Sequence, residues 1–133
     1  MSTVFADTSY FVALLNPRDD QHAAVRLWTA NFEGRLLTTA WVLVEAANFM
    51  SRGANRRAVL ELLKQLRRDE SVTIVPPLAE DYEQGLALFS QRLDKDWSLT
   101  DCISFVIMQR EGLTEAATAD AHFRQAGFRT VLR

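Results

Sequence analysis

Thr3-Val4-Phe5-Ala6-Asp7-Thr8-Ser9 is the stretch around which the rest of the chain is arranged. Its first four residues are β-branched, aromatic or small, as is typical of a short buried strand. The strand ends at the carboxylate of Asp7, and two hydroxyl side chains follow. In open parallel α/β sheets, ligands bind in the crevice beyond the carboxyl ends of the strands. We therefore expect Asp7 to face a ligand at that edge of a sheet.

Short apolar segments and helical segments alternate along the rest of the chain. Further strands are predicted at 35–38, 72–75, 115–119 and 129–131. Helices are predicted at 8–15, from 19 or 20 to about 30, and at 40–50, 55–70, 78–94, 99–110 and 120–126. Strands that alternate with helices form parallel sheets. We expect an α/β fold, a three-layer α/β/α sandwich with a short parallel sheet, in a single domain over residues 1–133.

Apolar residues at helical spacing predict which side of three helices faces the core. The predicted inward residues are Ala23, Leu27 and Ala30 in the second helix, Val59, Leu62, Leu63 and Leu66 in the fourth, and Tyr82, Leu86 and Phe89 in the fifth.

The composition limits the class of protein. A formal net charge of -2 excludes the strongly basic field of a protein that coats DNA. Cys102 is the only cysteine, so an internal disulfide is impossible, and with two histidines it cannot complete a structural zinc site. We expect a reducing, cytoplasmic setting. The sequence contains neither a signal-peptide pattern nor an apolar run of about 18 residues, so it does not predict membrane association.

Positive charge is concentrated in one segment. Six of the 15 basic residues lie between positions 52 and 68: Arg52, Arg56, Arg57, Lys64, Arg67 and Arg68. Two interpretations remain open, a surface that contacts phosphates or an acidic partner, and an ordinary solvated helix face.

Glu45 is a carboxylate in a strongly apolar helix. Its neighbours three and four positions away are Trp41, Val42, Asn48 and Phe49, and none is a cation. A buried, unpaired carboxylate costs several kcal/mol or becomes protonated. A functional role is therefore the preferred interpretation, and an exposed helix flank is the ordinary alternative.

Asp101 and Asp120 have the same character, with stronger alternatives. Asp101 follows Ser98 by three positions, which is also the pattern of a capping box. Asp120 follows the predicted strand at 115–119 as Asp7 follows the first, but it can also cap a helix or pair with Arg124.

Together these four acids, Asp7, Glu45, Asp101 and Asp120, predict a cation site. Carboxylates a few ångströms apart stay ionised only beside a compensating cation. Without a thiolate or imidazole cluster, oxygen ligands favour Mg²⁺ or Mn²⁺. Such an ion suits phosphodiester hydrolysis, and the sequence contains no Gly-x-Ser-x-Gly elbow, Cys-His pair or Walker loop for a different chemistry.

The chain resembles the PIN domain, the nuclease fold of VapC-type toxins in toxin-antitoxin pairs, over essentially its whole length. The matching motifs are Asp7-Thr8-Ser9, Glu45 with Asn48, Trp97-Ser98-Leu99-Thr100-Asp101-Cys102, and Asp120-Ala121-His122-Phe123.

This resemblance implies a Mg²⁺- or Mn²⁺-dependent endoribonuclease with sheet order 3-2-1-4-5, an RNA substrate, a homodimer and inhibition by a small antitoxin protein. It implies that Asp7 and Asp101 are the most direct metal ligands, while Glu45 and Asp120 bind a second ion or orient water. The groups that would hold these acids in place are Thr8, Ser9, Asn48, Ser98 and Thr100.

Two other functions are alternatives to the nuclease. A non-catalytic PIN-fold module could bind protein or RNA through the basic segment. A phospho-acceptor domain needs a lysine late in the chain, and the only lysines are Lys64 and Lys95.

Several residues are not assigned to the site. His22 and His122 are interpreted as packing or surface residues, although His122 remains of interest because it is close to Asp120. Asp96 could join the site, but an exposed loop position is the preferred interpretation. Trp97 is the one tryptophan predicted to lie beside the site and to be available for stacking on a base.

Overall fold

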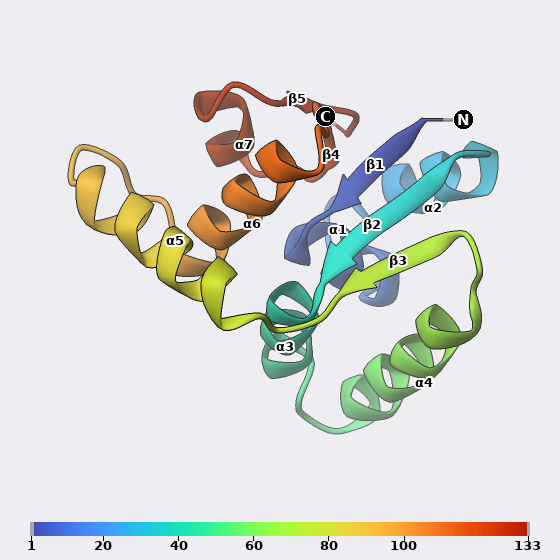
Figure 1. Ribbon diagram of the computed structural model, residues 1–133. Coiled ribbons are helices and arrows are strands. Elements are labelled where there is room, and N and C mark those ends of the chain that lie inside the picture. The colour runs from blue at the N-terminus through green and yellow to red at the C-terminus, as the bar shows by residue number, and fades with distance from the viewer. Residues whose placement is uncertain (1, 133) are drawn as a thin grey trace.

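The computed structural model describes residues 2–132, which form a five-stranded parallel sheet with helices on both faces (Figure 1). The strands are β1 (Thr3–Ala6), β2 (Arg35–Thr39), β3 (Val72–Val75), β4 (Glu115–Ala117) and β5 (Arg129–Thr130). Their order is β3-β2-β1-β4-β5, and every neighbouring pair is parallel. The expected α/β class and the strand order 3-2-1-4-5 are confirmed.

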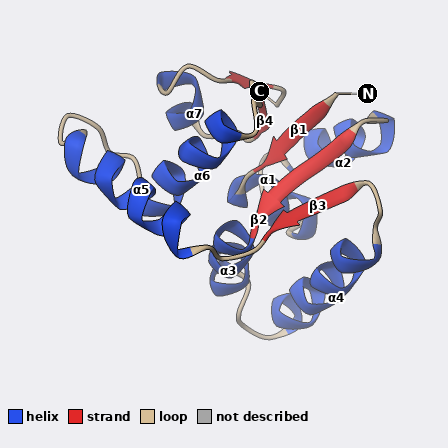
Figure 2. Cartoon of the chain, viewed as in Figure 1, coloured by secondary structure: helices blue, strands red, loops and turns tan. Residues whose placement is uncertain are grey.

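The helices fill the connections between the strands (Figure 2). They are α1 (Thr8–Leu15), α2 (His22–Asn31), α3 (Ala40–Phe49), α4 (Ala54–Arg68), α5 (Ala79–Gln91), α6 (Leu99–Arg110) and α7 (Ala121–Gln125). Because parallel crossovers are right-handed, α1, α2 and α4 cover one face of the sheet and α5, α6 and α7 the other. Helix α3 contacts α1, α4 and α6, so it closes the edge where the strands end. None of the helices in residues 2–132 has the length and hydropathy needed to cross a bilayer.

The central strand β1 lies in the middle of the core. Val4, Phe5 and Ala6 are at most 2% exposed, because β1 has a strand on each side and helices above and below. The ring of Phe5 lies 6.1 Å from that of Phe123 in α7. A strand this enclosed fixes the position of the residue that follows it, Asp7.

Strand β4 is shorter than predicted. It ends at Ala117 instead of residue 119, so Thr118 and Ala119 lie outside the sheet and Asp120 stands three residues beyond the strand end. Asp7 follows its strand directly. The two acids therefore reach the same edge of the sheet through different local geometry.

The predicted inward face of α2 is wrong. All three predicted residues, Ala23, Leu27 and Ala30, are exposed, and Leu27 is 67% exposed. Val25 is buried instead, and the Thr29 hydroxyl lies 2.8 Å from the hydroxyl of Tyr10 in α1. This contact with α1 turns the helix away from the orientation that its alanines and leucine suggest.

The predicted inward face of α5 is right for Tyr82, which is half-buried and packs against the core, but wrong for Leu86 and Phe89. Leu86 and Phe89 are 38% and 43% exposed, while Asp81 and Gly85 are buried. At Gly85 the helix approaches the backbone of α6 too closely for a side chain. Asp81 forms an ion pair with Arg110 of α6. The close contact and the ion pair together turn Leu86 and Phe89 toward solvent.

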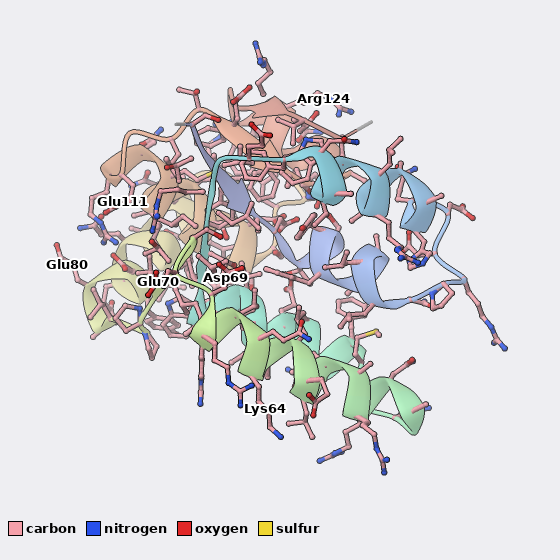
Figure 3. All side chains as sticks on the ribbon, turned by 90° about the vertical axis from the view of Figure 1, so that its right-hand side faces the viewer. Lys64, Asp69, Glu70, Glu80, Glu111 and Arg124 are labelled. Atoms are coloured by element: carbon pink, nitrogen blue, oxygen red, sulfur yellow. The ribbon has the colours of Figure 1, made fainter. Side chains whose placement is uncertain are left out.

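Helix α4 matches its prediction. Val59, Leu62 and Leu66 are buried, and Leu63 is half-buried. All six basic residues of the segment 52–68 are exposed. Figure 3 shows Lys64 pointing away from the body of the molecule. The six basic side chains therefore face solvent, which is compatible with both interpretations of this segment.

Candidate active site

A cavity of about 360 Å³ opens beyond the carboxyl ends of β1 and β4. Its lining includes six carboxylates and no lysine or arginine among the described residues. The carboxylates belong to Asp7, Asp19, Glu45, Asp96, Asp101 and Asp120. The structure thus brings all four predicted acids together, from segments that are far apart in the sequence.

Asp7 is the most enclosed acid of the cavity. It is 3% exposed, and its Oδ2 accepts a hydrogen bond of 2.9 Å from the Thr118 hydroxyl. Burial raises the pKa of Asp7 to about 7, and the nearby charges of Asp101 and Asp120 act in the same direction. The backbone amide of Thr8 and the Thr118 hydroxyl oppose this rise. Without a cation, Asp7 is therefore a carboxyl that ionises only near neutral pH.

Thr118 connects the residues around Asp7 and was missed in the sequence. Its Oγ1 lies 2.9 Å from the Ser9 hydroxyl and accepts the backbone N–H of Asp120 at 3.0 Å. No signal in the sequence indicates this role, because Thr118 is expected inside a strand. Since β4 ends at Ala117, the Thr118 side chain is free to turn toward Asp7.

Asp101 has both roles that the sequence left open. Ser98 Oγ accepts the backbone N–H of Asp101 at 3.0 Å, and Asp101 Oδ2 accepts that of Ser98 at 3.1 Å. This capping box starts α6 and also fixes Asp101 at the cavity wall, where it is 5% exposed. Burial raises the pKa of Asp101, while hydrogen bonds from His122 and Ser98 lower it.

Asp120 and His122 form a pair at the start of α7. Asp120 Oδ1 accepts the backbone N–H of His122 at 2.9 Å, so Asp120 is the N-cap of the helix. The ring Nδ1 of His122 lies 2.9 Å from Asp101 Oδ2 and 3.3 Å from Asp120 Oδ1. The interpretation of His122 as packing or surface is therefore wrong. Its position two residues after Asp120 was the only sequence signal.

Glu45 lines the cavity from α3, but it is half-buried instead of buried. Phe49, one turn later on the same helix, also lines the cavity and is 71% exposed. Glu45 therefore lies toward solvent, which removes the energetic cost that the apolar sequence around it suggested.

The five residues expected to hold the acids in place divide into two groups. Ser9 and Ser98 line the cavity and contact Asp7 and Asp101 respectively. Thr8 also lines it, and its buried hydroxyl has no hydrogen-bond partner among the described residues. Asn48 is exposed and Thr100 is half-buried, and neither lines the cavity.

Two loop residues before α6 behave differently from each other. Asp96 is exposed, as predicted, and also lines the cavity. The prediction for Trp97 is wrong: it is 6% exposed, and its indole N–H donates to Gln125 Oε1 at 3.1 Å. Its ring packs edge-on against Phe105. Trp97 is therefore a core residue that is not available to stack on a base.

The donor set suits a hard divalent cation. Asp101, Asp120 and His122 each offer a ligand atom, and these atoms lie within 4.8 Å of one another. The remaining lining acids add only oxygen donors. Oxygen-rich sites favour Mg²⁺ or Mn²⁺, whereas structural zinc sites use several thiolates or imidazoles. A cation would also offset the mutual repulsion of Asp7, Asp101 and Asp120.

Comparison with known proteins gives one family and one group of close relatives. The sequence profile described as PIN domain matches residues 4–129. The 23S rRNA-specific endonuclease VapC20 of Mycobacterium tuberculosis, from strains CDC 1551 and H37Rv, is 30% identical over 126 residues, which cover 94% of this chain and 95% of the relative.

Solved structures agree with the sequence comparison. The crystal structure of M. tuberculosis VapC20, described as a sarcin-ricin loop cleaving toxin, superimposes with a TM-score of 0.89 and 26% identity, covering 99% of this chain and 100% of that chain. FitAcB from Neisseria gonorrhoeae has a TM-score of 0.65 at 18% identity, covering 96% and 95%. The second similarity supports the fold alone.

Proposed function

Because this chain belongs to the PIN domain family, we propose that it is a metal-dependent endoribonuclease that hydrolyses RNA phosphodiester bonds and acts as the toxin of a toxin-antitoxin pair. The observation that carries this proposal is the meeting of Asp7, Glu45, Asp101 and Asp120 in one cavity, which no lysine or arginine of residues 2–132 lines. A carboxylate cluster without its own cations binds divalent metal and, through it, phosphate.

The proposed roles of the acids follow from their environment. Asp7 and Asp101 are the most enclosed of the four, so we assign them as the direct ligands of Mg²⁺ or Mn²⁺. Glu45 and Asp120 are more exposed and would bind a second ion or orient water. The bound ion would neutralise the phosphate and lower the pKa of a water molecule. Thr118 and Ser98 would keep Asp7 and Asp101 in place through their hydrogen bonds.

The substrate we propose is ribosomal RNA. VapC20 is named for its action on 23S rRNA, and it aligns with nearly the whole of this chain. The proposed setting is the cytoplasm, because ribosomal RNA is found there.

The proposed partners are a second copy of the chain and a small antitoxin protein. The antitoxin follows from the toxin function of the relative. The homodimer is supported by the outer side of α5 and its flanking residues, where Leu78, Leu86, Phe89 and Leu93 are 38 to 89% exposed. A twofold dimer places the same surface of both subunits in contact, which would bury this apolar stripe against itself.

RNA cleavage with and without Mn²⁺ tests the proposed function. Purified protein is incubated with 23S rRNA and with a sarcin-ricin loop oligonucleotide, and the cut ends are mapped. We expect Mn²⁺-dependent cleavage that falls by about 100-fold or more in Asp7→Asn and Asp101→Asn, since each loses a charged ligand.

Glu70→Gln is the matched control, because Glu70 is an exposed acid outside the cavity. It should cleave like the wild type. Unchanged cleavage by both Asp7→Asn and Asp101→Asn would contradict the proposal, and absence of Mn²⁺ binding would favour a non-catalytic binding module.

A further inference from the structure

We infer that His122 is a positioning residue that holds one oxygen of Asp101 and one of Asp120, and thereby directs their other oxygens to a divalent cation. The inference rests on the proposed metal-dependent function. It concerns how the site is held in shape, and it assigns His122 no direct contact with the metal.

The contact with Asp101 defines the proton on the imidazole ring. Asp101 Oδ2 already accepts the backbone N–H of Ser98 at 3.1 Å, so this oxygen acts as an acceptor. His122 Nδ1 lies 2.9 Å from the same oxygen, and because an ionised carboxylate can only accept, Nδ1 donates to it when Asp101 is in the ionised form that binds metal. A protonated Nδ1 has no lone pair for a metal. Asp101 Oδ1 has no hydrogen-bond donor among residues 2–132 and remains available as a ligand.

The contact with Asp120 combines a hydrogen bond from the backbone of His122 with a short distance to its ring. Asp120 Oδ1 accepts the backbone N–H of His122 at 2.9 Å, and the ring Nδ1 lies 3.3 Å from that oxygen. No donor in the described part of the chain contacts Asp120 Oδ2. His122 therefore engages one oxygen of each carboxylate and leaves the other oxygen of each free.

The position of His122 makes it the residue that links the two acids. Asp101 begins α6 and Asp120 caps α7, and Nδ1 of His122 is within 3.3 Å of both. No lysine or arginine of the described chain lines the cavity, so no permanently charged side chain offsets the repulsion between them. Residues that orient metal ligands in this way typically change metal affinity by about 10 to 100-fold when they are removed.

Calorimetric titration with Mn²⁺ at fixed pH tests this inference on the wild type and three variants. In His122→Asn, the amide nitrogen replaces Nδ1, whereas in His122→Gln it reaches the more distant position of Nε2. We expect His122→Ala to raise the Kd for Mn²⁺ by about 10 to 100-fold, and His122→Asn to restore it to within about threefold of the wild type. The affinity of His122→Gln for Mn²⁺ should stay as weak as that of His122→Ala.

His22 provides the matched control. Its Nδ1 contacts the Ala13 carbonyl oxygen at 2.7 Å, and it does not line the cavity. His22→Asn should leave the Kd unchanged, and it also leaves a single imidazole in the chain. In the His22→Asn variant, ¹⁵N NMR should show a proton on Nδ1 of His122, both in metal-free protein and after addition of Mg²⁺, which is diamagnetic.

The outcomes separate this inference from the proposed function. Wild-type affinity in His122→Ala, failure of His122→Asn to restore binding, or an Nδ1 without a proton would each overturn the role of His122. If Asp101→Asn still weakens Mn²⁺ binding in that case, the proposed function survives. If the wild type binds no Mn²⁺, both fail. Thermal unfolding checks that each variant is folded. If His122→Ala is unfolded, the difference in Kd for Mn²⁺ between His122→Asn and His122→Gln tests the inference instead.

Discussion

Asp7 combines almost complete burial with partners that carry no positive charge. Its contacts are hydroxyl and amide donors, and the nearest charged groups are other acids. Burial is the largest cause of its raised pKa. A carboxyl in this environment is more stable protonated than ionised, unless a cation is bound beside it.

Metal-free protein should therefore lose stability as the pH rises from about 4 to about 7. The folded state holds the Asp7 proton up to about pH 7, whereas the unfolded chain releases it near the ordinary aspartate pKa of 3.8. The folded state binds more protons in this window, so the free energy of unfolding falls with pH, by at most about 4 kcal/mol. Urea unfolding in a chelator at pH 5 and pH 8 measures this difference.

Asp7→Asn is the decisive variant for this pH dependence. We expect it to flatten the profile and to be more stable than the wild type at pH 8 without metal, since no charge is buried. Glu70→Gln should keep the wild-type profile. A wild-type profile in Asp7→Asn would mean that another group causes the dependence, and Asp101, whose pKa burial also raises, would be the next to replace.

Thr118 offers a second prediction at the scale of one residue. Thr118→Val keeps the shape of the side chain but removes the donor to Asp7 Oδ2 and the acceptor of the Asp120 amide. We expect a loss of about 1 to 3 kcal/mol in the free energy of unfolding, because buried polar groups lose their partners. Thr118→Ser keeps the hydroxyl and should be closer to the wild type in urea unfolding. Equal losses in both variants would point to packing instead of hydrogen bonding.

At the scale of elements, the contact between α5 and α6 determines which side of α5 faces solvent. Gly85 of α5 lies against Ile103 of α6. One turn earlier on α5, Asp81 forms an ion pair with Arg110 of α6. A glycine and an acid thus occupy the most buried positions of α5, and Leu86 and Phe89 lie outside.

Gly85→Ala should therefore destabilise the protein. The added Cβ would lie 2.9 Å from Ile103 Cα, which is backbone and cannot move aside without separating the helices. We expect a loss of about 1 to 3 kcal/mol in urea unfolding, although alanine has the higher helix propensity. Ala87→Ser, at an exposed position of the same helix, should change stability by no more than about 0.5 kcal/mol. A more stable Gly85→Ala would show that propensity outweighs the contact.

At the scale of the whole molecule, the exposed stripe of α5 predicts self-association. Phe89→Glu should convert a dimer into a monomer, because it places a charge in the apolar contact that we propose. Light scattering coupled to size exclusion measures the mass. Leu60→Glu is the control, since Leu60 is also exposed but lies on α4. A wild-type protein that is monomeric at all concentrations would contradict the dimer.

How well the fold could be predicted from the sequence also depends on the scale of the feature. The strands and the starts of α3 and α6 were predictable, because buried strand sequences and the capping residues Thr39 and Ser98 act over a few positions. The start of α2 was not, since this helix begins at His22 instead of Asp19 or Asp20. The rotation of α2 and α5 was not, because the side that a helix buries depends on the partner it meets. Leu27 and Phe89 follow the apolar pattern and are nevertheless exposed.

In the site, too, some features could be predicted from the sequence and others depended on the tertiary structure. The sequence by itself determined the candidate acids, because Asp7 and Glu45 stand in apolar surroundings that do not favour an uncompensated charge. Only the tertiary structure decided that Thr118 and His122 hold two of the acids in place and that Trp97 is a core residue. The physical reason is that hydrogen bonds and burial depend on distances between segments that are remote in sequence, and those distances are fixed only when the strands and helices pack.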